Sequence, residues 1–218
     1  MASLDLDNDM KQDVKISEGV ESLDDFRSSA KSCFESLGLP NKRMERWKYT
    51  DLTRKLYGYE IEIMKAPTGF ARDCRDIGLK NSVKLYFQNG TWQKDLTDTK
   101  TIPDGVVIKS LSKVIASNPT QVLNKFKELD HSSEPMLALN QAEVFDGIEL
   151  DIQQDLILDD PIEFIYLNNN EAFKNKDKTC QVANYRHILN IAKGANVKIV
   201  EHVDSSFATP SEKAIAHP

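Results

Sequence analysis

The most constraining feature of this sequence is the series of short β-forming runs that follows Asp146-Gly147, a dipeptide typical of turns. Polar or proline-containing segments separate the runs, and no helical pattern intervenes between them. Such a region folds as a sandwich, a barrel or a stacked solenoid, and periodicity alone does not distinguish these folds. The runs are IELDI, DLIL, IEFIYL, ANYRHILNI and NVKIVEHV.

Residues 20–140 have a different, mixed α/β character. Apolar residues recur at three- and four-residue steps and predict a helix over about 22–37, with Ser22 as its N-cap and Gly38 as its stop. A second helical stretch is expected to begin near Asn41.

Further along this region, strands and helices are both expected. Asn89-Gly90 between alternating residues predicts a two-residue hairpin turn, and the segment VVIKS predicts a strand. Two helices are expected on either side of Asn118-Pro119, with Thr120 capping the second.

The net negative charge of the chain lies in its N-terminal residues. Residues 1–25 hold eight acids and two lysines, a charge of 2 − 8 = −6, which equals the net charge of the whole chain. This composition is typical of a solvated, disordered arm. No apolar run approaches the roughly 20 residues that cross a bilayer, and the start resembles neither a secretory signal nor a transit peptide. We therefore expect a cytoplasmic protein that does not bind membranes.

One segment, 42–49, is basic and aromatic. Such a composition can bind nucleic acid, because cations meet phosphates while aromatic rings stack on bases. A structural role is favoured instead, because Glu45 can pair with Lys48 and the chain beyond residue 25 has zero net charge. Trp47 and Tyr49 would then anchor a helix. The cations of the segment are Lys42, Arg43, Arg46 and Lys48.

Isolated polar residues do not assemble into a catalytic or metal-binding pattern. Glu201-His202 and Arg186-His187 are adjacent pairs, so in a strand the two members point to opposite faces. The odd set of Cys33, Cys74 and Cys180 contains no Cys-x-x-Cys pair and is interpreted as buried thiols, and Cys180 with His187 alone makes a weak metal site. There is no glycine-rich phosphate loop. A carbohydrate-active β-helix enzyme would need two carboxylates facing a cleft.

At this point three collinear stretches resemble the SufD family of the SUF iron–sulfur cluster assembly system. GLPNKRMERWKYTDL resembles a motif near the N-terminus of that family, although Asn41 replaces the usual threonine. Residues 137–152 resemble its Ala-Leu-Asn-x-Ala…Asp-Gly segment, and residues 185–205 resemble its Gly-Ala…Glu-His run. The matching motif residues include Pro40, Glu45, Trp47, Lys48, Tyr49 and Thr50, which we expect to be structural or partner-facing.

The resemblance implies an α+β fold in which a helical and α/β region is followed by the first coils of a right-handed parallel β-helix. We expect an acidic tail over 1–20, the helical and α/β region over 21–135, the start of the β-helix over 136–205 and a tail over 206–218. Members of the family are longer, so this chain is expected to be a truncated, N-terminal portion.

The resemblance also implies a non-enzymatic scaffold that acts with SufB-like and SufC-like subunits. Family residues implicated in cluster assembly lie in later strands, so no catalytic, cofactor-binding or metal-binding residue is carried over to this chain. An iron–sulfur cluster, and any flavin, would be bound only by the assembled complex. The open end of the β-helix is expected to favour self-association. The alternative is a nucleic-acid-binding module that uses 42–49, and nucleic acid is the less favoured partner.

Overall fold

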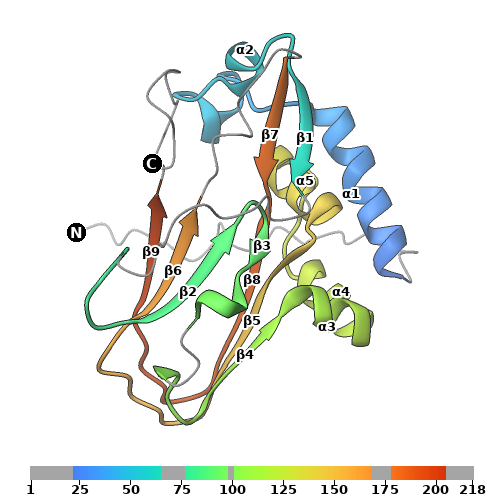
Figure 1. Ribbon diagram of the computed structural model, residues 1–218. Coiled ribbons are helices and arrows are strands. Elements are labelled where there is room, and N and C mark those ends of the chain that lie inside the picture. The colour runs from blue at the N-terminus through green and yellow to red at the C-terminus, as the bar shows by residue number, and fades with distance from the viewer. Residues whose placement is uncertain (1–21, 65–76, 98–100, 168–177, 205–218) are drawn as a thin grey trace, which may run out of the picture.

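The computed structural model describes residues 22–64, 77–97, 101–167 and 178–204, which form a mixed α+β fold (Figure 1). The helical elements are α1 (Leu23–Leu37), η1 (Glu45–Trp47), α2 (Leu52–Lys55), η2 (Lys94–Leu96), α3 (Leu111–Ser117), α4 (Pro119–Lys127) and α5 (Pro135–Glu143). The strands are β1 (Glu60–Met64), β2 (Val83–Gln88), β3 (Thr91–Trp92), β4 (Val106–Ser110), β5 (Asp146–Ile152), β6 (Ile162–Leu167), β7 (Thr179–Ala183), β8 (Tyr185–Ile191) and β9 (Ile199–Asp204).

Local sequence signals set the bounds of α1 as predicted. The Ser22 hydroxyl accepts a hydrogen bond from the Asp25 backbone N–H at 3.1 Å, which satisfies one of the unpaired donors of the first turn. At the other end, Gly38 has φ = 68° and its N–H donates to the Phe34 carbonyl at 2.8 Å. Glycine adopts this left-handed conformation without a Cβ penalty, so the helix stops there.

The hairpin and the paired helices are also confirmed, with one correction. Asn89 and Gly90 have φ values of 47° and 88° and join β2 to β3. The chain divides between α3 and α4 at Asn118-Pro119, but the N-cap of α4 is Asn118, whose side chain accepts from the Gln121 N–H at 3.2 Å. The prediction that Thr120 caps this helix is wrong, because Thr120 already lies inside it.

The described strands form three sheets with the orders β1-β7, β3-β2-β6-β9 and β4-β5-β8. Consecutive strands from β5 to β9 visit these sheets in turn, so β8 returns to lie parallel beside β5 and β9 returns to lie parallel beside β6. Strands from the first half join the same sheets, because β1 pairs in parallel with β7 and β2 with β6, and β4 pairs antiparallel with β5. Figure 1 shows β6, β9 and β2 on one side and β4, β5 and β8 on the other.

The two largest apolar clusters of the described residues stabilise this arrangement. The larger one lies between sheets and includes Leu85, Phe87 and Ile148, all fully buried. The second joins α1, α3 and α4 to the sheet that contains β8, and it includes Phe26, Leu111 and Phe126. The helices α3 and α4 therefore cover a sheet face that would otherwise expose apolar side chains.

Three expectations for the secondary structure are wrong. Asp146-Gly147 is the start of β5, and DLIL contributes only an isolated bridge from Ile157 to Asn196. Asp155 within DLIL has φ = 58°, a left-handed turn conformation that prevents an extended strand. The helical stretch expected near Asn41 is reduced to η1 and the single turn of α2.

The helix α5 and the strands β1 and β7 have no counterpart among the expected elements. Over the described parts of the chain, no helix is long and apolar enough to cross a membrane.

Candidate functional site

A pocket of about 650 Å³ lies among α5, β1 and the strands β6 to β9. Much of its wall is apolar and includes Met64, Met136, Leu139 and Val182. The polar side chains Tyr166, His187 and Glu201 line the same space and come from the strands β6, β8 and β9 respectively. A concave, mostly apolar space with a few convergent polar groups has the form of a small-molecule site.

The three polar side chains are joined by hydrogen bonds. The Tyr166 hydroxyl lies 3.0 Å from Nε2 of His187 and 2.8 Å from Oε1 of Glu201. On the other side of the imidazole, the Ile148 backbone N–H donates to Nδ1 of His187 at 3.3 Å.

These contacts fix which group donates in each of the three hydrogen bonds from Ile148 to Glu201. Because Nδ1 of His187 accepts from a backbone N–H, the neutral ring carries its proton on Nε2 and donates to the Tyr166 oxygen. The Tyr166 hydroxyl is then free to donate its own proton to Glu201. The backbone of β5 thereby orients a carboxylate on β9 through two intervening side chains.

Burial keeps the two middle groups neutral. It lowers the pKa of His187 to about 4, with a smaller opposing effect from Asp146, because a charged imidazole would lose its hydration. Burial also raises the pKa of Tyr166, and the adjacent Glu201 carboxylate raises it further. This arrangement positions hydrogen-bond acceptors, and it provides no nucleophile activated by a lowered pKa.

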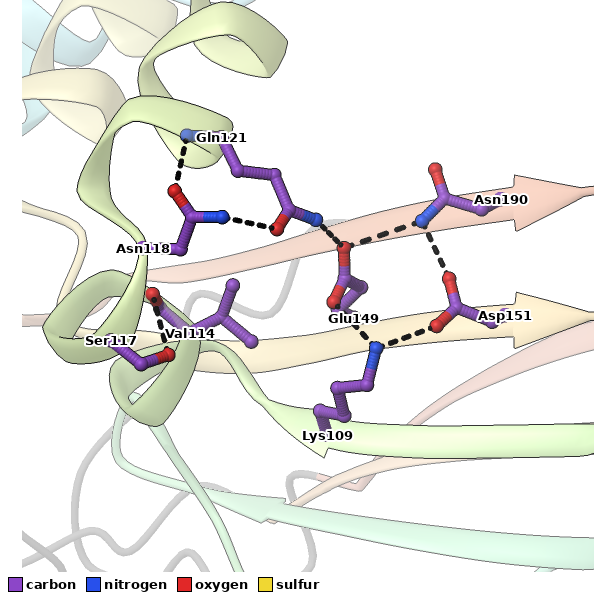
Figure 2. Close-up of polar contacts among 8 residues, drawn as sticks. All are labelled: Lys109, Val114, Ser117, Asn118, Gln121, Glu149, Asp151 and Asn190. Atoms are coloured by element: carbon purple, nitrogen blue, oxygen red, sulfur yellow. Dashed lines mark hydrogen bonds and ion pairs between the residues drawn. The ribbon is translucent and has the colours of Figure 1, made fainter.

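A second polar cluster lies where α4 covers the sheet β4-β5-β8 (Figure 2). Glu149 on β5 is 1% exposed and accepts from the Gln121 amide of α4 at 2.6 Å, while Lys109 on β4 lies 3.3 Å from its other oxygen. Asn190 on β8 donates to Asp151 at 2.7 Å and to Glu149 at 3.4 Å. The cluster therefore connects one helix to all three strands of the sheet.

Electrostatics in this second cluster favour the charged forms. The hydrogen bond to Asp151 raises the pKa of Lys109. Burial acts to raise the pKa of Asp151, but hydrogen bonds from Lys109 and Asn190 outweigh it and hold that pKa below its usual range. The cluster is fully occupied by its own partners, so its chemistry is that of a structural clamp.

The basic and aromatic motif lies elsewhere and is largely exposed. Arg46 forms an ion pair with Glu134 at 3.1 Å, and Lys48 forms one with Glu45 at 2.7 Å. Tyr49 is 92% exposed, and the Lys48 ammonium lies 5.3 Å from the centre of its ring. The prediction that Tyr49 anchors a helix is therefore wrong.

Other members of the motif pack more closely against the chain. Pro40 is buried and its carbonyl accepts from the Thr53 N–H at 3.0 Å, while Trp47 is half-buried and its carbonyl accepts from the Thr50 N–H at 2.8 Å. Of the described residues that line the pocket, none belongs to this motif. Whether the motif is structural or partner-facing stays a prediction.

The remaining sequence candidates do not converge on one site. Glu201 contacts Tyr166, whereas His202 lies 3.8 Å from a buried oxygen of Glu163, so the adjacent pair does point to opposite faces. Arg186 packs over the Phe126 ring at 5.2 Å, and its guanidinium lies 3.4 Å from Oδ1 of Asn140, a residue that lines the pocket. Cys33 and Cys180 are free and half-buried, and Cys74 lies outside the described residues. Within those residues, no group of three or more metal-ligating side chains occurs.

Sequence reasoning missed the link from Tyr166 through His187 to Glu201. These residues lie far apart in the chain and meet only because β6, β8 and β9 are brought together by the fold. The available signal was the alternation of side chains along a strand, which places His187 on the opposite face from Arg186 and Glu201 on the opposite face from His202.

Comparison with known proteins identifies the family. The family model described as "SufBD protein N-terminal region" matches residues 4–164, which include the basic and aromatic motif but not Tyr166, His187 or Glu201. An iron–sulfur cluster assembly SufBD family protein of Synechocystis sp. is 24% identical over 148 residues. That match covers 65% of this chain and 31% of the relative, so the chain spans about a third of the length of that protein. Because the family model covers well over half of the 218 residues, this chain belongs to the SufBD protein family.

Proposed function

We propose that this chain is the N-terminal part of a SufD-like subunit and serves as a non-enzymatic scaffold component of iron–sulfur cluster assembly. The family match over residues 4–164 is the observation that carries this proposal. The Synechocystis relative, named as an iron–sulfur cluster assembly protein, supports the same role. The finer assignment to SufD rests on the segment Trp47 to Thr50, which resembles the SufD motif.

We also propose that the strands from β5 onward are the first coils of a right-handed parallel β-helix. The supporting observation is that β5 and β6 each pair in parallel with a strand that follows after a full turn through the three sheets. Asp146 of β5 pairs with Tyr185 of β8, and Ile162 of β6 pairs with Ile199 of β9. A solenoid stacks its coils in this way. The proposed β-helix begins at residue 136, after a helical and α/β region over 21–135.

The proposed partners are SufB-like and SufC-like subunits, with any iron–sulfur cluster or flavin held by the assembled complex. Among the described strands, β8 and β9 lie at the edges of their sheets, which makes them candidates for pairing with another polypeptide or with a second copy. Self-association would appear as a concentration-dependent sedimentation coefficient. A chain that sediments as a monomer at every concentration would contradict it.

Co-purification tests the scaffold proposal. The full-length protein is to be co-expressed with a SufB-like and a SufC-like subunit, and we expect one complex that retains all three on size exclusion. A matched pair of variants then tests the motif: Trp47→Ala with Lys48→Ala should weaken the complex if the motif faces a partner, whereas Lys125→Ala should not. If the unaltered protein forms no complex with either subunit, the proposal fails.

A nucleic-acid-binding module is the second candidate, and the 92% exposure of Tyr49 beside Lys48 is the observation that favours it. Against it, the ion pairs with Glu134 and Glu45 already engage Arg46 and Lys48. The test is binding to single-stranded DNA and RNA at low salt. Binding that weakens with salt and with Lys42→Ala plus Arg43→Ala would support this candidate, and no retention would eliminate it.

A further inference from the structure

The charged lining of the pocket beside β9 is negative. Its described lining contains a single acidic side chain, Glu201, and no lysine or arginine. The other titratable members of the lining are tyrosines and His187, and burial favours their neutral forms. Arg186 lies behind the lining, with its guanidinium 3.4 Å from Oδ1 of the lining residue Asn140. Glu201 is therefore the charged side chain that the described lining presents to a ligand.

The carboxylate of Glu201 is oriented by a hydrogen bond within the protein. Tyr166 donates to Oε1 of Glu201 at 2.8 Å, and Tyr166 is itself held by His187 at 3.0 Å. Among the described residues, no donor contacts the second oxygen of Glu201, Oε2. A carboxylate that is oriented on one oxygen and has no donor from the described part of the chain on the other is a preorganised acceptor for a charged donor.

Aromatic rings stand next to this acceptor. Tyr166 and Tyr185 both line the pocket, and their ring centres are 5.1 Å apart. The two rings contact each other, and Tyr166 also stacks on Phe87 with ring centres 5.4 Å apart. They therefore form a packed aromatic wall beside the carboxylate, against which the apolar part of a ligand can lie.

The rest of the pocket wall is largely apolar and therefore favours a ligand with an apolar part. Met64, Met136 and Leu139 line the pocket, whose volume of about 650 Å³ is that of a small-molecule site. Glu201 is on the exposed side, so a ligand can place a polar head there while its apolar part enters the interior.

We propose that this pocket binds a small organic cation, an ammonium group on an apolar body, with the ammonium at Glu201. A divalent metal fits less well, because backbone and side-chain partners already engage both ring nitrogens of His187. The proposal does not depend on the role in iron–sulfur cluster assembly.

The test compares three probes of equal length on the 218-residue chain: hexylammonium, hexanol and hexanoate. Binding is followed by amide NMR shifts of residues 181–185 and 201–203. We expect hexylammonium to bind most tightly, hexanol more weakly and hexanoate most weakly. Equal affinities, a preference for hexanoate, or no binding of any probe would overturn the proposal.

Two variants locate the ammonium. Glu201→Gln should weaken hexylammonium binding at least about tenfold while leaving hexanol unchanged, because only the charged donor loses its partner. Tyr166→Phe keeps the ring but removes the hydroxyl that orients Glu201, and a smaller loss is expected. Glu128→Gln, at an exposed acid outside the pocket, should change nothing. Unchanged hexylammonium affinity in folded Glu201→Gln would contradict the assigned position.

Discussion

The ammonium of Lys109 lies 3.3 Å from Oε2 of Glu149, a carboxylate whose side chain is only 2% exposed. Lys109 is half exposed, so one member of the pair keeps contact with water while the other is buried. Such an asymmetric pair avoids the full cost of desolvating two ions, yet the buried carboxylate depends on its neighbours for compensation.

Replacing Lys109 with methionine should therefore destabilise the fold. Glu149 would keep its hydrogen bonds from Gln121 and Asn190 but lose its countercharge. We expect the free energy of unfolding to fall by roughly 2–3 kcal/mol, as measured by urea denaturation. The matched control is Lys125→Met, whose partner Glu128 is 63% exposed, and which should cost less than about 0.5 kcal/mol. Equal effects of the two variants would refute the clamp.

The buried His187 should make stability depend on pH. Its pKa is about 4 in the fold against 6.5 for an unperturbed histidine, so between these values the unfolded chain binds a proton that the folded chain does not. The free energy of unfolding is therefore unaffected by His187 above pH 6.5, where the ring is neutral in both states. It falls as the pH is lowered from 6.5, by up to about 3 kcal/mol at pH 4.

Denaturation at several pH values checks this dependence. His187→Gln should flatten the loss of stability between pH 6.5 and 4 relative to the unaltered chain. His202→Gln, at a side chain that is 41% exposed, should retain the original slope. A slope that persists in His187→Gln would assign the effect to other groups.

Gly147 should tolerate no side chain. It has φ = 152°, and a Cβ at this position would lie 1.8 Å from the Arg186 carbonyl oxygen on β8. Gly147→Ala is thus expected to cost about 3 kcal/mol or more, or to prevent folding. Gly38→Ala adds a Cβ in open space at φ = 68°, and only the backbone penalty of about 1–2 kcal/mol should appear. Thermal unfolding followed by circular dichroism separates the two outcomes, and similar values for both would contradict the close strand approach.

Tyr49 should contribute little to stability. Because its side chain is 92% exposed, Tyr49→Ala should change the free energy of unfolding by less than about 0.5 kcal/mol. Phe26→Ala, in the helical core at 4% exposure, should cost about 3–5 kcal/mol. A large loss of stability in Tyr49→Ala would restore the anchoring role that the sequence suggested.

Local signals were the part of the fold that could be predicted. Ser22, Gly38 and Asn89-Gly90 act on backbone groups within a few residues, so their effects are visible in sequence. The dipeptide Asp146-Gly147 misled for a physical reason. Its aspartate is buried and accepts from the Trp92 and Ser112 N–H groups, and its glycine permits contact with β8, so both residues serve long-range packing instead of a turn.

The candidate pocket could not be predicted in the same way. The link between Tyr166 and His187 requires knowing which strands are neighbours and in what register, and no local pattern encodes that. The solvent exposure of single side chains could not be predicted either. The aromatic character of Tyr49 suggested burial, yet its side chain lies in solvent.

The pairing of β1 with β7 has a consequence for the order of events during synthesis. Glu60 lies beside Thr179 in a two-stranded sheet, and the side chains of Glu62 and Gln181, 119 residues apart, are hydrogen-bonded. While the ribosome is still translating the middle of the chain, β1 has emerged without its partner, and closing so long a loop is slow. Nascent chains of this protein should therefore hold β1 unpaired until β7 leaves the exit tunnel, a stage at which a chaperone would find an open strand.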